Sequence, residues 1–170
     1  MERYRTLLPR FAALILDVVL LLPLAIVDEQ IKSAAFSQEF KWVLFLITDL
    51  AEIIYFIVMH GLFGQTVGKM LMNVKVLDVS EAPVKFRQAI LRDLPQLLFI
   101  IGSFIFLYPL SLVEIDPNSP AYWKNPFFIL IFVWGIVDLL AVLTNEKRRA
   151  LHDYIAGTVV VRINQNSDAR

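Results

Sequence analysis

Four acidic residues lie inside long apolar stretches of the sequence: Asp17, Asp49, Glu52 and Asp138. A charged side chain costs roughly 2.5–3.5 kcal/mol at the middle of a bilayer, so acids in such stretches must face one another, a cation or water. A carboxyl group held away from water can bind a proton, and carboxylates with carbonyl oxygens can bind a small hard cation. A site that alternates between these two states has the minimal chemistry of a proton-coupled cation exchanger.

The chain that carries these acids has the composition of a membrane protein. Of its 170 residues, 58% are hydrophobic and 19% are charged, against about 45–50% and about 25% in soluble domains. It has no cysteine, which excludes disulfides, thiolate nucleophiles and sulfur metal sites. Its net charge of zero argues against a broadly basic nucleic-acid binder. We expect one membrane domain over residues 1–163, followed by a flexible tail at 164–170.

Four stretches are long and apolar enough to cross a bilayer, which takes about 20 residues of helix. They cover residues 11–27, 42–59, 94–113 and 126–144. Of the 16 basic residues, 13 lie before the first stretch, between the second and third, or after the fourth. Loops rich in Lys and Arg stay in the cytoplasm. The sequence therefore predicts an all-α, multi-pass protein of the cell (inner) membrane, with four transmembrane helices and both termini cytoplasmic.

The segment from residue 61 to residue 93 keeps a regular pattern, which favours structure over disorder. Apolar residues alternate with others over 72–77, and 157–163 is rich in valine. We expect these segments to pair as a small cytoplasmic β-ribbon, which needs a surface to pack on. Residues 84–93 have apolar positions three and four apart with basic residues off that face. This pattern predicts an amphipathic helix that lies in the cytoplasmic interface.

The topology places three of the acids at one depth. At about 1.5 Å per residue, Asp17 and Asp138 lie about 9 Å and Glu52 roughly 10 Å from the cytoplasmic ends of their stretches, with Asp49 about 5 Å deeper. Arg10 is the nearest base, and it can pair with Asp17 or with an acid on a neighbouring helix. Two interpretations stay open. The acids either serve only as packing clamps, or the surplus acids carry protons or bind a cation.

Several separated motifs resemble the RDD family of membrane proteins, which is named for one arginine and two aspartates. Arg10 and Asp17 match the first two letters, and Asp153, beside His152, resembles the third. Two further stretches agree with the family, namely Gly64, Gln65, Thr66, Gly68 and Lys69 after the second span, and Arg92 with Asp93 before the third.

The resemblance covers nearly the whole chain and implies a membrane protein. For the family, transport of a ligand has been suggested, and cation/proton antiport has been proposed for some members. Two spans are the family minimum, so the resemblance gives no role to Asp49, Glu52 or Asp138.

We expect structural or gating roles for the family motif residues. The segment from Gly64 to Lys69 lacks the spacing of a phosphate loop, and we expect a turn there that relies on Gly68. For Asp153 we expect contact with Arg10 or capping of the terminal segment. The two histidines, His60 and His152, lie on different segments, so we expect no metal site, no cofactor and no enzymatic nucleophile.

Two functional hypotheses follow. The first is a small transporter that moves a monovalent cation, protons or both through a carboxylate-lined intramembrane site of Asp17, Asp49, Glu52 and Asp138, with Arg10 as their charge partner. Four short helices enclose little space, so a homo-oligomer in the lipid bilayer is expected. The second is a non-transporting assembly or regulatory module that binds a partner through residues 61–93. Convergence of carboxyl groups within about 6 Å, near enough to affect each other's ionisation, would favour the first.

Overall fold

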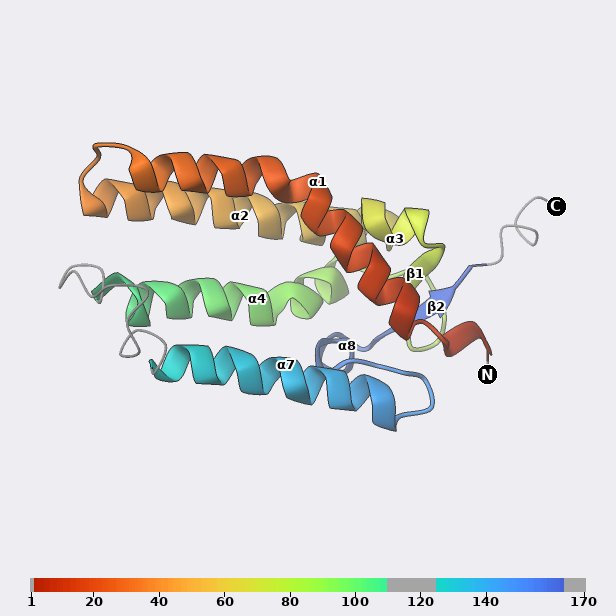
Figure 1. Ribbon diagram of the computed structural model, residues 1–170. Helices are drawn as coiled ribbons and strands as arrows, with labels where there is room; N and C mark the ends of the chain where they lie inside the picture. The colour runs from red at the N-terminus through yellow and green to blue at the C-terminus, as the bar shows by residue number, and fades with distance from the viewer. Residues whose placement is uncertain (1, 110–124, 164–170) are drawn as a thin grey trace.

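Four long helices form the body of the protein. The computed structural model describes residues 2–109 and 125–163. Its long helices, all long and apolar enough to cross a membrane, are α1 (Leu7–Ser33), α2 (Gln38–Phe63), α4 (Phe86–Phe106) and α7 (Pro126–Thr144). They run side by side over most of their length (Figure 1). The four predicted transmembrane helices are thus confirmed, and α7 has the predicted bounds.

Two of these helices are longer than their apolar stretches. The sequence predicts helices over 11–27 and 42–59, whereas α1 and α2 continue for several residues at both ends. Ser37 caps the start of α2, because its hydroxyl accepts a hydrogen bond from the N–H of Phe40 at 3.3 Å. Pro23 lies inside α1, where it removes a backbone donor, and α1 bends in its middle (Figure 1).

Most large apolar side chains of these helices face outward. Leu14 of α1, Ile54 of α2 and Leu130 of α7 are each more than half exposed. Exposed apolar surface on this scale is unfavourable in water and is what a bilayer covers. The chain is therefore a membrane protein with little core between its helices.

The predicted amphipathic helix and third span form one continuous helix. The sequence predicts an interfacial helix over 84–93 and a span over 94–113 as separate elements, but α4 runs from Phe86 to Phe106 with Pro95 inside it. Ala89 and Arg92 near its start are buried, because this part of α4 packs on α8 (Leu151–Ala156). The last residues of the predicted span, 110–113, and the predicted tail lie outside the described residues.

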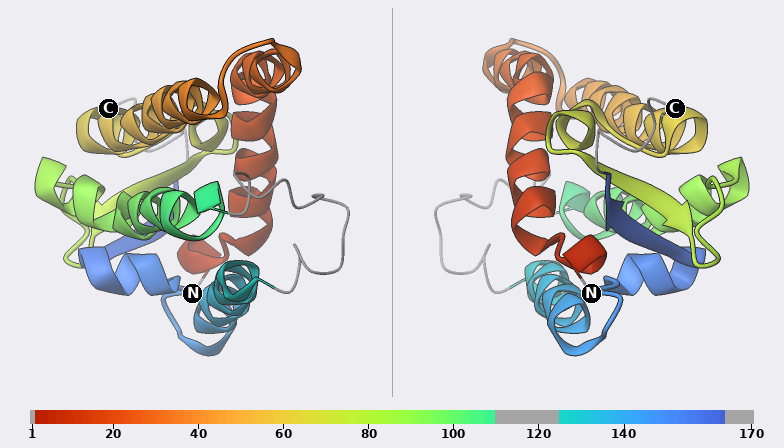
Figure 2. Two further views of the ribbon diagram at one scale, coloured as in Figure 1. Left: turned by 90° about the vertical axis from the view of Figure 1, so that its left-hand side faces the viewer. Right: turned by 90° about the vertical axis from the view of Figure 1, so that its right-hand side faces the viewer.

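The predicted β-ribbon is confirmed. Strands β1 (Val74–Asp78) and β2 (Thr158–Arg162) pair antiparallel, with Val76 opposite Val160. Val76 and Val160 are fully buried. Met72 and Val84 cover this side of the ribbon, and Tyr4 covers the other side. The ribbon lies across one end of the bundle, between α1 and α4 (Figure 2). We call this end, with the short helix α3 (Val67–Leu71), α8 and the start of α1, the sheet end, and the opposite end the loop end.

The turn after α2 needs a different glycine from the one we expected. Gly64 ends α2 with a left-handed backbone, φ +67°, and the short helix α3 (Val67–Leu71) follows. Gly68 lies inside α3, where an added Cβ would come within 2.1 Å of the Ala13 carbonyl oxygen. The glycine at 68 therefore allows close contact with α1, and the turn itself relies on Gly64.

Candidate functional site

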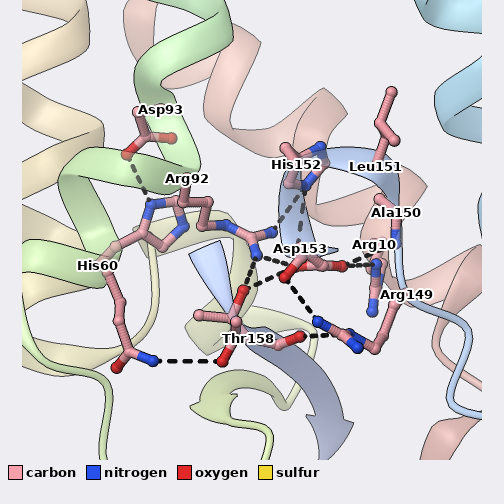
Figure 3. A network of polar contacts seen from close by, with 12 residues as sticks. Arg10, His60, Arg92, Asp93, Arg149, Ala150, Leu151, His152, Asp153 and Thr158 are labelled. Atoms are coloured by element: carbon pink, nitrogen blue, oxygen red, sulfur yellow. Dashed lines mark hydrogen bonds and ion pairs between the residues drawn. The ribbon is translucent and has the colours of Figure 1, made fainter. Parts of the chain in front are cut away.

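A buried carboxylate, Asp153, lies at the centre of the sheet end (Figure 3). Its Oδ2 accepts a hydrogen bond from Arg10 Nη1 of α1 at 2.9 Å, and its Oδ1 accepts one from Arg92 of α4. The Thr158 hydroxyl, at the start of β2, donates to Oδ1 at 3.1 Å. One carboxylate thus joins α1, α4, α8 and β2.

Local chain geometry places Asp153. It occupies the first turn of α8, where its Oδ2 accepts the Ala150 N–H at 3.0 Å and caps the helix. Gly157, with φ +65°, then ends α8 and turns the chain into β2. Burial alone would raise the pKa of Asp153, but the charges of Arg92 and Arg10 hold it well below its usual range. Of the two alternatives for Asp153, the contact with Arg10 is present, and the cap that it forms is at the start of α8 and not on the terminal segment.

The network continues to Asp138 of α7 through His152. Arg92 Nη2 lies 3.0 Å from His152 Nε2, and His152 Nδ1 lies 3.0 Å from Asp138 Oδ1. A guanidinium can only donate, so Nε2 accepts and Nδ1 carries the proton that it donates to Asp138. The Leu151 N–H also donates to Asp138 Oδ1, at 2.9 Å. Asp138 therefore holds the start of α8 against α7.

Asp17 links α1 to α3. Its carboxylate is buried and accepts three hydrogen bonds, from the Thr66 hydroxyl at 2.5 Å, the Gly68 N–H at 2.8 Å and the Tyr55 hydroxyl at 3.0 Å. The Tyr55 oxygen in turn accepts the Val67 N–H at 3.1 Å. Asp17 thereby fixes the first turn of α3 against the middle of α1.

The three residues of the motif, Arg10, Asp17 and Asp153, thus hold the sheet end together. The model of the RDD family matches residues 4–157. The chain belongs to the RDD family. No curated protein and no solved structure matches it.

A second polar chain at the sheet end of this RDD protein is centred on His60 of α2. The buried His60 ring has its Nδ1 3.3 Å from Asp93 Oδ2 and its Nε2 2.5 Å from Lys69 Nζ. Burial and the nearby charge of Arg92 lower the pKa of Lys69 to about 7. Lys69, outside the transmembrane helices, can therefore gain or lose a proton near neutral pH.

The other two acids of the apolar stretches, Asp49 and Glu52, line a separate cavity of this RDD protein between α1 and α2, toward the loop end. Its volume is about 200 Å³, and its lining includes Asp28, Asp49, Glu52 and Phe56. The Thr48 hydroxyl donates to Asp28 Oδ1 at 2.7 Å. The amide of Gln96 on α4 interacts with Glu52. Among residues 2–109 and 125–163, no group of His, Asp and Glu side chains is arranged to hold a metal ion.

The acids predicted to share one layer have different partners in this RDD protein. Asp17 binds α3, Asp138 binds α8, and Glu52 faces Gln96 and the cavity. Arg10 was expected to pair with Asp17 or with an acid on a neighbouring helix. It pairs with Asp153 of α8, an acid that lies outside the spans.

Sequence reasoning gave no role to several residues of these networks, among them Asp28, Tyr55, His60 and Thr158. Asp28 falls one residue beyond the predicted first span, so it was not among the acids of the apolar stretches. The sequence does indicate a place for His60. It follows Glu52 by eight residues, which places both residues on nearly the same face of α2.

Proposed function

We propose that this RDD protein is a small membrane transporter that moves protons, in exchange for a monovalent cation, along one face of α2. The observation that carries the proposal is the acid-lined cavity of Asp28, Asp49 and Glu52. No lysine or arginine is among the described residues that line it. Acids that share a small space without a base compete for protons or take a cation.

The face of α2 that carries these acids also carries the buried histidine. Asp49, Glu52, Phe56 and His60 follow one another at spacings of three and four residues, which keeps them on one side of the helix. Phe56 lines the cavity, and its ring stacks on that of His60 with 6.3 Å between the centroids. Titratable groups therefore line α2 from the cavity to the sheet end, with one aromatic ring between them.

In the proposed cycle, the cavity holds either protons or the cation. When Asp49 or Glu52 releases its proton, the carboxylate gains the charge that attracts a monovalent cation. Return of a proton neutralises the carboxylate and releases the cation. Movement of the proton on to His60, and from there to Asp93 or Lys69, requires Phe56 to move aside.

The proposal gives Asp17 and Asp138 positioning roles. Each carboxylate accepts several hydrogen bonds from fixed groups, Asp17 from α3 and Tyr55 and Asp138 from the first turn of α8. A carboxylate that accepts this many hydrogen bonds holds its donors in place, and its loss would leave them without an acceptor. Proton carriage is therefore assigned to the less restrained acids of the cavity.

Flux into proteoliposomes tests this function. A pH-sensitive dye inside the vesicles reports proton movement driven by an inward Na⁺ or K⁺ gradient. We expect Glu52→Gln and Asp49→Asn to abolish cation-driven proton efflux. Glu29→Gln is the matched control, because Glu29 is an exposed acid at the loop end that pairs with Lys32 and does not line the cavity. Flux that is unchanged in both cavity variants, or absent from the wild-type protein under every cation gradient, would reject the proposal.

Self-association is part of the proposed function. One chain of four helices leaves most of its apolar side chains exposed, and a second copy would cover part of them and enclose the cavity on its open side. Cross-linking in native membranes, followed by mass measurement of the complex in nanodiscs, tests for this homo-oligomer. A single copy per nanodisc, for a protein that shows full flux in proteoliposomes, would remove this part of the proposal.

The alternative, a partner-binding module at residues 61–93, has less support. Arg92 is buried on Asp153, and β1 is covered within the chain. Lys85 and Arg87 remain as exposed basic residues there. Their replacement by Gln should leave flux unchanged if the protein is a transporter and abolish partner co-purification if it is not.

A further inference from the structure

Three arginines converge on a pocket at the sheet end. The pocket has a volume of about 590 Å³, and Arg5, Arg148 and Arg162 line it. They come from three places in the chain, namely the segment before α1, the α7–α8 connection and the end of β2. None of the described residues that line the pocket is acidic. Positive charge is therefore concentrated here from parts of the chain that are far apart in sequence.

These arginines differ from their neighbours in having no partner among the described residues. Arg10 and Arg92 bind Asp153, and Arg149 donates to the carbonyl oxygens of Asp153 and Thr158. Within the described part of the chain, the guanidinium groups of the three pocket arginines have no ion pair and no hydrogen bond. Three like charges around one space repel one another, and an anion in the pocket would relieve that repulsion.

The wall of the pocket is apolar. It consists of residues from the first turns of α1, together with Met72 just before β1. Leu8 in this wall is 78% exposed. Because α1 is a transmembrane helix that begins here, this wall stands where the bilayer interface meets the protein. The first turn of a helix also carries a partial positive charge.

The α7–α8 connection holds Arg148 at the pocket by a tight turn. Arg148 has a left-handed backbone, φ +47°, which is unfavourable for a residue other than glycine or asparagine. Its N–H donates to the Asn145 carbonyl oxygen at 3.1 Å, and the Asn145 side chain accepts the Arg149 N–H at 2.8 Å. A strained backbone that its neighbours maintain is a feature found at binding sites.

We propose that this pocket binds the headgroup of an anionic phospholipid. The phosphate lies among Arg5, Arg148 and Arg162, and an acyl chain of the lipid lies along the apolar wall of α1. A basic pocket that opens beside a transmembrane helix matches both halves of such a lipid. The arginine fork also suits phosphate oxygens, which it binds in pairs. The lipid would tie the start of α1, the α7–α8 connection and β2 together at the membrane surface.

Native mass spectrometry of the full chain in a neutral detergent tests the proposal. The probes are phosphatidylglycerol and phosphatidylcholine with identical acyl chains. We expect phosphatidylglycerol to bind more tightly than phosphatidylcholine. Removal of each arginine should lower the affinity for phosphatidylglycerol roughly fivefold, because a basic residue near the membrane surface attracts the anionic headgroup. The triple variant Arg5→Gln, Arg148→Asn, Arg162→Gln should lose more than about twentyfold of the affinity. Asparagine is used at 148 because it tolerates the left-handed backbone.

A triple variant with the same charge change elsewhere is the control. Lys85→Gln, Arg87→Gln and Lys147→Gln alter exposed residues outside the pocket and should keep the binding. If the pocket variant does not fold, the single changes Arg5→Gln and Arg162→Gln, at exposed side chains, give the same comparison.

Three outcomes would overturn the assignment. They are equal affinity for the two lipids, equal loss in the pocket and control variants, and displacement of the lipid by millimolar glycerol phosphate, which would assign the pocket to a soluble anion.

Discussion

Arg10 and Asp153 are 143 positions apart in the chain, and their side chains meet at 2.9 Å. The contact joins the start of the first transmembrane helix to the last short helix before the final strand. Arg92 binds the other oxygen of the same carboxylate. The sheet end is therefore closed by one buried acid between two bases, all of them contributed by the family motifs.

Loss of the Asp153 charge should strongly destabilise the protein. In Asp153→Asn the guanidinium groups of Arg10 and Arg92 would face each other in a buried site without their counter-charge. Breaking a buried ion pair by removal of one partner costs about 3–5 kcal/mol. Unfolding in mixed detergent, followed by circular dichroism, measures the loss.

Glu81→Gln is the matched control for that experiment. Glu81 pairs with Arg3, whose side chain is 53% exposed, and an exposed pair contributes about 0–1 kcal/mol. Equal losses in the two variants would show that burial of Asp153 does not govern the stability of the sheet end.

Gly68→Ala should weaken the contact between α3 and α1. The new Cβ would lie 2.1 Å from the Ala13 carbonyl oxygen and 2.9 Å from the Asp17 carboxyl carbon, so one helix has to move. Overpacking of this kind costs about 1–3 kcal/mol, measured as a lower melting temperature. Gly135→Ala is the control, because its new Cβ would meet no atom of another described element within 4 Å, and it should be neutral or slightly stabilising in a helix. A smaller effect at 68 than at 135 would contradict the close approach.

Much of the fold was predictable because its signals are local. Four apolar stretches gave the transmembrane helices, and alternation in 72–77 with the valines of 157–163 gave the ribbon. Where the structure differs, the deciding interaction is tertiary. The need for glycine at 68 arises from Ala13, which is 55 positions away, and no turn pattern near 68 records it.

The candidate site was predicted less well, because depth in the membrane does not fix the direction of a side chain. Asp17, Glu52 and Asp138 were placed in one layer, but the rotation of each helix turns them toward α3, α4 and α8. Asp28 was missed because α1 continues as helix beyond its apolar stretch. Hydropathy locates the middle of a helix better than its ends, and polar residues at the ends complete this cavity.

Lys69 should make stability depend on pH above neutrality. Its pKa is lowered to about 7 in the folded protein, because the side chain is partly withdrawn from water beside the charge of Arg92, whereas the unfolded chain keeps a pKa of about 10.4. Between these values the unfolded chain holds a proton that the folded protein does not. The free energy of unfolding should therefore rise with pH over this interval.

Lys69→Met removes this contribution. Melting temperatures at pH values of about 6.5, 8 and 9.5 should rise less steeply in the variant than in the wild type, while Lys85→Gln, at an exposed lysine, should follow the wild type. Parallel profiles for all three proteins would show that Lys69 keeps its ordinary ionisation.

Phe56 should control proton leak if the proposed function holds. Its ring lies between the acid-lined cavity and His60, so Phe56→Ala would open a space that water can enter and join the two groups of titratable residues. We expect proton conduction without any cation gradient to increase severalfold in proteoliposomes, whereas Phe56→Leu, which keeps an apolar side chain in place, should retain coupling. Phe40→Ala, at an exposed ring near the loop end, is the control for general loosening of α2. If leak rises equally in Phe56→Ala and Phe40→Ala, the aromatic barrier has no specific role, and if neither variant leaks, protons do not pass along this face of α2.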